Sequence, residues 1–66
     1  MKLRYPEVRV RLVGEDGNAF FILGRVTAAL KKAGATKEER NEFMMEATSG
    51  DYDHLLATVC RWVDAR

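Results

Sequence analysis

The stretch Val8–Val13 reads VRVRLV, a strict alternation of apolar and basic side chains. Side chains of a strand point in turn to the two faces of a sheet, so Val8, Val10 and Leu12 are expected on one face and the two arginines on the other. The alternation therefore predicts a half-buried strand near the N-terminus of the chain.

A turn over residues 14–18 (GEDGN) follows the strand, and Asn18 is suited to cap a helix. Asp16-Gly17 between apolar runs is also a hairpin signal, which would make residues 19–23 a second strand. The spacing favours a helix, because apolar residues recur three and four positions apart over Ala19–Ala33.

The end of this first helix is marked by Gly34, which can adopt the left-handed conformation after a helix. Ala35 is then expected to contact Leu30, as in a Schellman motif. Together these residues predict a sharp stop and a short connection to the next helix.

Two further helices are expected. Thr36 and Glu39 have the spacing of a capping box, which begins a helix that ends near Thr48. Its predicted buried face is Phe43, Met44 and Ala47, with Arg40 at the edge. The third helix begins around Asp51 and has the strongest apolar stripe of the chain. The residues expected to be buried there are Tyr52, Leu55, Leu56, Val59, Trp62 and Val63.

The sequence thus predicts an α+β fold in which one strand precedes three short helices within a single domain, residues 1–66. A lone strand needs a partner for its backbone hydrogen bonds. Residues 1–5 could fold back, residues 19–23 could pair after all, or two subunits could pair their Val8–Val13 strands about a two-fold axis. The last solution is favoured, which predicts a homodimer.

Size argues against an enzyme. A chain of 66 residues and 7.5 kDa buries only about 60% of its surface, which allows one small core. A substrate pocket of roughly 300 Å³ or more is hard to build in it. His54 is expected to be exposed, and the lone Cys60 to be a small buried side chain. No catalytic residue, metal or cofactor is predicted.

The composition is that of a folded chain, with 47% hydrophobic residues and a net charge of +1. The longest apolar run, Ala19–Leu23, is far shorter than a membrane span. The first residues lack the apolar stretch of a secretory signal. The expected location is therefore the cytoplasm, with no membrane partner.

The near-neutral net charge hides an asymmetry. Residues 1–37 carry eight basic and three acidic side chains, whereas residues 38–66 carry three basic and seven acidic ones. Four of the cations lie on or beside the predicted strand, namely Lys2, Arg4, Arg9 and Arg11. Alternating arginines on a strand resemble the ribbon-helix-helix regulators, whose paired strands read DNA. That resemblance implies nucleic-acid binding, although two acids follow the strand where those regulators pass into a helix.

Large apolar residues are in surplus on the first helix. Phe20 and Phe21 fall outside its apolar stripe, and Gly24 and Ala28 form a small-residue notch beside them. Because glycine within a helix costs about 1 kcal/mol relative to alanine, Gly24 predicts a backbone or an aromatic ring in close approach. These four residues are the predicted protein-interaction site.

Two segments, VGEDGNAF at residues 13–20 and ATSGDYDHLL at residues 47–56, resemble small accessory proteins of bacteria and their phages. The resemblance covers most of the chain and implies no activity and no functional residue. It implies a bacterial or phage accessory protein, and binding of a host or defence complex is the use hypothesised for such a protein. The leading hypothesis is a non-enzymatic protein-binding module, and the alternative is a nucleic-acid-binding protein.

Overall fold

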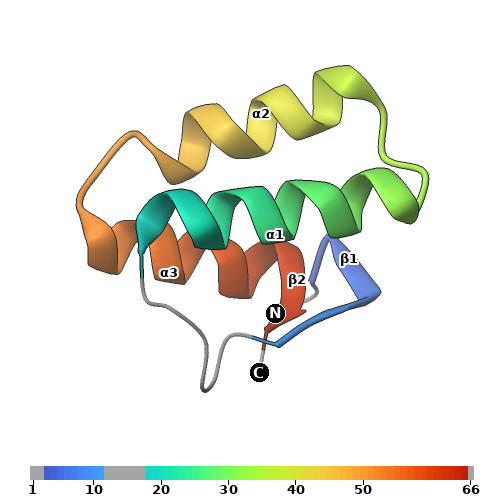
Figure 1. Ribbon diagram of the computed structural model, residues 1–66, viewed down its shortest axis with the longest axis horizontal. Helices are drawn as coiled ribbons and strands as arrows, with labels where there is room; N and C mark the ends of the chain where they lie inside the picture. Colours follow the sequence, from blue (N-terminus) through green and yellow to red (C-terminus); the bar gives the residue numbers. More distant parts are fainter. Residues whose placement is uncertain (1–2, 12–17, 66) are drawn as a thin grey trace.

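The computed structural model describes residues 3–11 and 18–65, which form two strands and three helices. In chain order they are β1 (Tyr5–Val10), α1 (Ala19–Lys32), α2 (Lys37–Ala47), α3 (Tyr52–Trp62) and β2 (Val63–Ala65). Helix α1 crosses the front of the molecule with α2 above it and α3 behind, and the two strands lie together at one end (Figure 1). The predicted α+β class, with a strand followed by three helices, is confirmed.

The partner of β1 is β2, which the sequence analysis missed. The two strands pair in parallel, with Tyr5 opposite Val63, Arg9 opposite Asp64 and Val10 opposite Ala65. Parallel strands need a long crossover, and here the three helices provide it. The alternative that pairs residues 19–23 with the strand is wrong, because they lie in α1. Pairing of β1 across a homodimer stays a prediction.

Strand β1 has the predicted two-sided character. Val8 and Val10 are buried, whereas Arg9 and Arg11 are exposed. The strand begins earlier than predicted, at Tyr5, whose ring stacks on Trp62 with 6.0 Å between centroids. Leu12 and the turn up to residue 17 lie outside the described residues.

The predicted helix ends are confirmed. The Asn18 side chain accepts a hydrogen bond from the Phe20 N–H at 2.8 Å, which begins α1. Gly34 has a φ of 95°, and the Ala35 N–H donates to the Leu30 carbonyl at 2.9 Å, which closes the helix as a Schellman motif does. Thr36 and Glu39 form both hydrogen bonds of the capping box.

One core cluster joins all five elements. Its centre is the fully buried Leu30, Phe43 and Val59, and Trp62 packs edge-on against Phe43 at 5.4 Å between ring centroids. The buried hydrophobic residues are Val8, Val10, Ile22, Leu23, Val26, Leu30, Ala35, Phe43, Ala47, Leu55, Val59, Trp62 and Val63.

Two residues predicted for this core are exposed. Met44 is 37% exposed because it borders the groove between α1 and α2 rather than the core between α2 and α3. Tyr52 is 43% exposed because it stands in the first turn of α3, beside a surface hollow. Leu56 is partly buried at the edge of the core.

Alanine substitutions at Gly50 and Gly24 are expected to change the stability of the protein in opposite directions. A Cβ at Gly50 would lie 2.8 Å from the Cβ of His54, so the Gly50→Ala variant forces backbone and ring apart and should lose about 1–3 kcal/mol. A Cβ at Gly24 has nothing within 4 Å, so Gly24→Ala should gain about 0.5–1 kcal/mol of helix stability. Urea unfolding of both variants checks the pair, and a destabilised Gly24→Ala variant would contradict the open surface described at that position.

Candidate protein-interaction site

The outward side of α1 is apolar. Phe20 is 84% exposed and Phe21 41%, whereas Ile22, Leu23, Val26 and Leu30 of the same helix are buried. Phe20, Phe21, Gly24 and Ala28 line one shallow hollow together with Arg25. We call these four apolar residues the α1 face. The structure thus brings together all four residues predicted for protein interaction, on one side of one helix.

Gly24 corrects one step of the sequence analysis. We expected a backbone or ring of the chain itself to approach it closely, but no described atom lies within 4 Å of the position that a Cβ would take. Glycine within a helix costs about 1 kcal/mol relative to alanine, and no contact within the described fold offsets that cost. Within residues 3–11 and 18–65, no atom outside the helix itself fills the space above Gly24.

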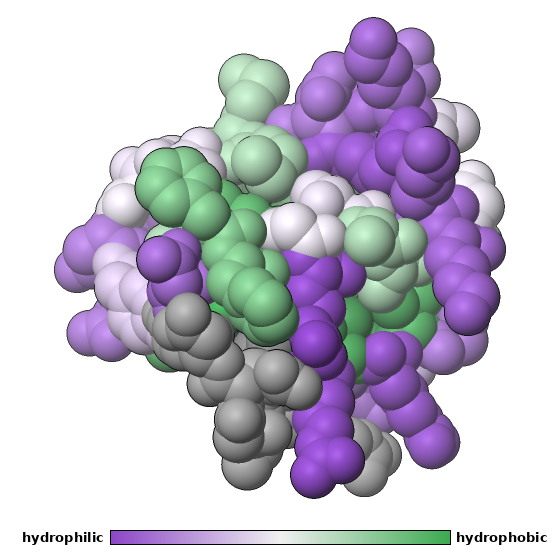
Figure 2. Space-filling view, in the orientation of Figure 1, coloured by the Kyte–Doolittle hydropathy of each residue, from purple (hydrophilic) through white to green (hydrophobic). Residues whose placement is uncertain are grey.

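Apolar surface continues on both sides of the α1 face. A second hollow, between the start of α1 and the α2–α3 connection, is bordered by Phe20, Leu23 and Tyr52. On the other side, Met44 borders a groove between α1 and α2 whose further lining is polar, namely Thr27, Lys37, Arg40 and Asn41. Figure 2 shows green surface over the first half of α1, with paler green of α2 beside it and purple side chains around it. The exposed area is therefore a contiguous patch rather than one isolated ring.

Arg25 borders the α1 face on the side of the sheet. Its guanidinium lies 5.2 Å from the centroid of the Phe21 ring. It also donates a hydrogen bond to the Arg11 carbonyl at 3.2 Å. Sequence reasoning missed this residue, although its place four positions after Phe21 on the same helix was a usable signal.

The basic strand residues do not form a single free surface. Arg4 is paired with Glu42 and lies over the Trp62 ring, 4.2 Å from its centroid. Arg9 lies 3.7 Å from the Asp64 carboxylate. Arg11 is exposed, and Lys2 is outside the described residues. The N-terminal cations thus meet acids of the C-terminal half, which accounts for part of the charge asymmetry within the fold itself.

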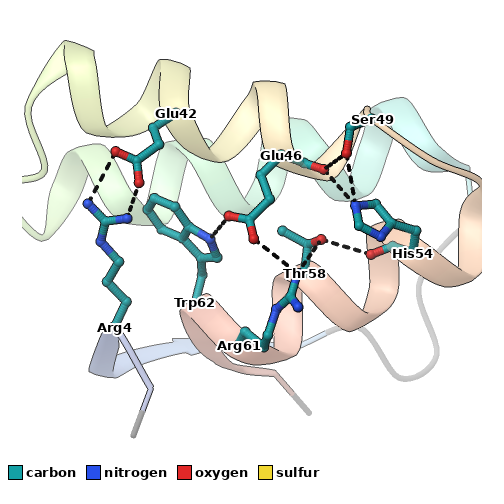
Figure 3. Close-up of polar contacts among 8 residues, drawn as sticks. All are labelled: Arg4, Glu42, Glu46, Ser49, His54, Thr58, Arg61 and Trp62. Atoms are coloured by element: carbon teal, nitrogen blue, oxygen red, sulfur yellow. Dashed lines mark hydrogen bonds and ion pairs between the residues drawn. The ribbon is translucent and has the colours of Figure 1, made fainter.

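The Glu46 side chain lies on the side of α2 that faces α3, where it contacts two side chains of α3 (Figure 3). Its carboxylate accepts hydrogen bonds from Trp62 Nε1 at 2.9 Å and from Arg61 at 3.0 Å. Arg61 also donates to the hydroxyl of Thr58, which is fully buried. These contacts join α2 to α3 around the indole ring.

His54 is partly buried, not exposed as predicted, because the end of α2 covers it. Its Nε2 lies 2.8 Å from the Glu46 carbonyl and 3.0 Å from the Ser49 hydroxyl. A carbonyl only accepts, so Nε2 carries the proton and cannot act as a base toward Ser49. The side chains of Ser49 and His54 thus both hydrogen-bond to the Glu46 carbonyl near the C-terminal end of α2. Cys60 is likewise exposed rather than buried, because it lies on α3 beyond Leu56 at the edge of the core.

The Glu39 carboxylate gives the fold an acid-sensitive contact. Its pKa lies below the ordinary value of 4.5, chiefly because the Thr36 backbone N–H donates to it and next because the Tyr5 hydroxyl does. The same hydrogen bond to Glu39 raises the pKa of Tyr5 above 10.0. A carboxylate with a lowered pKa stabilises the folded state above the unfolded pKa, and this contribution is lost as pH falls through the folded pKa.

Wild-type protein should therefore lose part of its free energy of unfolding below about pH 4.5, and Glu39→Gln should lack that part of the loss. Tyr5→Phe keeps the ring on Trp62 but removes one donor, so its acid loss should be intermediate. Urea unfolding at several pH values between about 7 and about 3 measures all three proteins. Parallel profiles of wild type and Glu39→Gln would contradict the role given to this carboxylate.

Comparison of the chain with family models, curated proteins and solved structures finds no match. Within residues 3–11 and 18–65, no helix is long and apolar enough to cross a membrane. In the same residues, no three His, Cys, Asp or Glu side chains are grouped so that they could hold a metal ion. The case for function therefore rests on the geometry of the surface.

Proposed function

We infer that the protein is a non-enzymatic module that binds another protein through the α1 face. The observation that carries this proposal is the position of Phe20, which is 84% exposed on a helix whose opposite side fills the core. Burying an exposed phenylalanine in an interface is worth about 1.5–3 kcal/mol. The face has the composition of an interface centre, with aromatic side chains around a shallow hollow.

The proposed setting is a phage or mobile-element accessory protein, as the sequence resemblance implies, and its proposed target is a host or defence complex in the cytoplasm. The exposed thiol of Cys60 is compatible with a reducing compartment. A homodimer paired through β1 is part of the proposal, and it leaves the α1 face open because that face lies on a helix and not on the sheet edge.

Two exposed apolar side chains provide a matched test. Phe20→Ala removes the most exposed aromatic side chain of the α1 face, whereas Met45→Ala removes a 74% exposed side chain of α2 that borders none of the hollows described above. Partner capture from host lysate, compared by quantitative mass spectrometry, should fall at least tenfold for Phe20→Ala and stay at the wild-type level for Met45→Ala. Circular dichroism of both variants should match wild type, since neither side chain belongs to the core.

Equal capture by all three proteins would overturn the proposed site. Nucleic-acid binding is a separate outcome, detected as a gel shift with mixed DNA and RNA at low salt that weakens steeply as salt rises. The ion pair of Arg4 counts against that outcome, because a phosphate would have to displace Glu42.

A further inference from the structure

All the charged residues of α1 are basic. Helix α1 contains Arg25, Lys31 and Lys32 and no acidic residue. The groove beside it adds Lys37 and Arg40 of α2. The apolar strip formed by the α1 face thus has Arg25 at one edge and Lys37 and Arg40 in the groove at the other.

Three of the four carboxylates of α2 are used elsewhere, and the fourth, Glu38, does not line the groove. Glu39 bonds to Tyr5 and to the Thr36 backbone, Glu42 pairs with Arg4, and Glu46 holds Trp62 and Arg61. Figure 3 shows the side chains of Glu42 and Glu46 directed toward β1 and α3. Asp51, beside the hollow at the start of α1, accepts the His54 N–H as a helix cap. These bonded acids are therefore occupied in holding the fold together.

The shape of the strip favours a helix as its occupant. An extended peptide gains affinity by adding to a sheet edge, whereas the backbone groups within a helix are already hydrogen-bonded. Gly24 and Ala28 are four residues apart and so lie one turn above the other, which leaves a shallow stripe beside the two phenylalanines. Side chains of an approaching helix can enter such a stripe, as ridges enter grooves between packed helices.

A second copy of the same chain fits the strip poorly. Two antiparallel copies of α1 centred on Gly24 and Ala28 would bring the two Arg25 side chains near each other. Each copy of α1 carries three cations and no acidic residue within the helix. Like charges held together across an interface are unfavourable, so the charge pattern selects an occupant of opposite sign.

We propose that the α1 face binds an amphipathic helix of a partner protein whose apolar stripe is flanked by Asp and Glu. This inference rests on the protein-binding function proposed above and adds the structure and charge of the partner segment. The apolar stripe lies over Phe20, Phe21, Gly24 and Ala28, and the acids meet Arg25 at one edge of this face and Lys37 and Arg40 at the other.

The test uses a displayed library of 16-residue helical peptides, with a fixed apolar stripe and random residues at the flanking positions. The library is selected on full-length wild-type protein and counter-selected on Phe20→Ala. Peptides that survive should be enriched in Asp and Glu at the flanks. Their affinity should fall at least tenfold on an Arg25→Glu/Lys37→Glu variant, while Lys32→Glu, whose side chain lines a separate hollow beside β1, changes it less.

Each outcome decides one of the two proposals. Surviving peptides with neutral or basic flanks would overturn the acidic helix and leave the protein-binding face standing. Recovery of no peptide that depends on Phe20 would overturn the face itself. Self-association of wild type in sedimentation experiments that Phe20→Ala abolishes would assign the face to a second copy and would also overturn the acidic helix. Circular dichroism establishes that each variant is folded.

Discussion

Trp62→Ala is expected to unfold most of the protein at room temperature. Trp62 is 3% exposed, stacks on Tyr5, packs edge-on against Phe43, and donates its Nε1–H to Glu46. Removing a large buried aromatic side chain costs about 3–5 kcal/mol. A 66-residue domain has only about 3–10 kcal/mol of stability in total. Thermal unfolding followed by far-ultraviolet circular dichroism should show a reduced, broad or absent transition.

Trp62→Phe separates packing from hydrogen bonding at the same position. The phenyl ring retains much of the contact with Phe43 but leaves the Glu46 carboxylate with Arg61 as its remaining side-chain donor. The expected loss is about 1–3 kcal/mol, smaller than for Trp62→Ala. A loss below about 1 kcal/mol for Trp62→Ala would show that the indole is not the centre of packing described here.

Val63→Asp is the second change with a large expected effect. Val63 is fully buried in β2 opposite Tyr5, among the hydrophobic side chains of the core. Burying an unpaired charge costs several kcal/mol, which is comparable with the whole stability of the domain. Urea unfolding should show loss of the cooperative transition.

Asp64→Ala on the same strand is the control for that prediction. It removes the 3.7 Å contact with Arg9, an exposed ion pair whose loss should cost less than about 1 kcal/mol. If Val63→Asp also costs less than about 1 kcal/mol, β2 does not pack on the core as the structure has it.

The local features of the fold were predictable because they depend on neighbours in the sequence. The Asn18 cap, the Thr36–Glu39 capping box and the Gly34 stop each need only three to six adjacent residues. The side of α1 that is buried follows from its spacing alone. For the same reason, helical spacing is sufficient to place Phe20 and Phe21 away from the buried side.

The long-range features were not predictable. Strand β2 has three residues and follows Trp62 at once, so its sequence continues the apolar stripe of α3 and gives no signal of its own. The exposure of Met44 depends on where α1 lies relative to α2, which a single helix does not encode. The ion pair of Arg4 and Glu42 joins positions 38 residues apart. Counting charges along the sequence therefore shows an excess of cations in one half and of acids in the other, but not that these two side chains are in contact.

The candidate site was predicted in its residues but not in its surroundings. The four apolar positions lie on one helix, so helical spacing brings them together. The cations that flank them from α2 come together only through the packing of α1 against α2. Three acids of α2 are directed to β1 and α3 by contacts with Tyr5, Arg4 and Trp62, which lie far away in the sequence.

The binding role of the α1 face is tested most directly by photo-crosslinking in the native host. Phe20 is replaced by p-benzoylphenylalanine in one variant and Met45 in another, since both side chains are largely exposed and only the first belongs to the α1 face. We expect a discrete covalent adduct with one partner protein from position 20 and none from position 45. Absence of an adduct at position 20, or the same adducts from both positions, would contradict the proposed function.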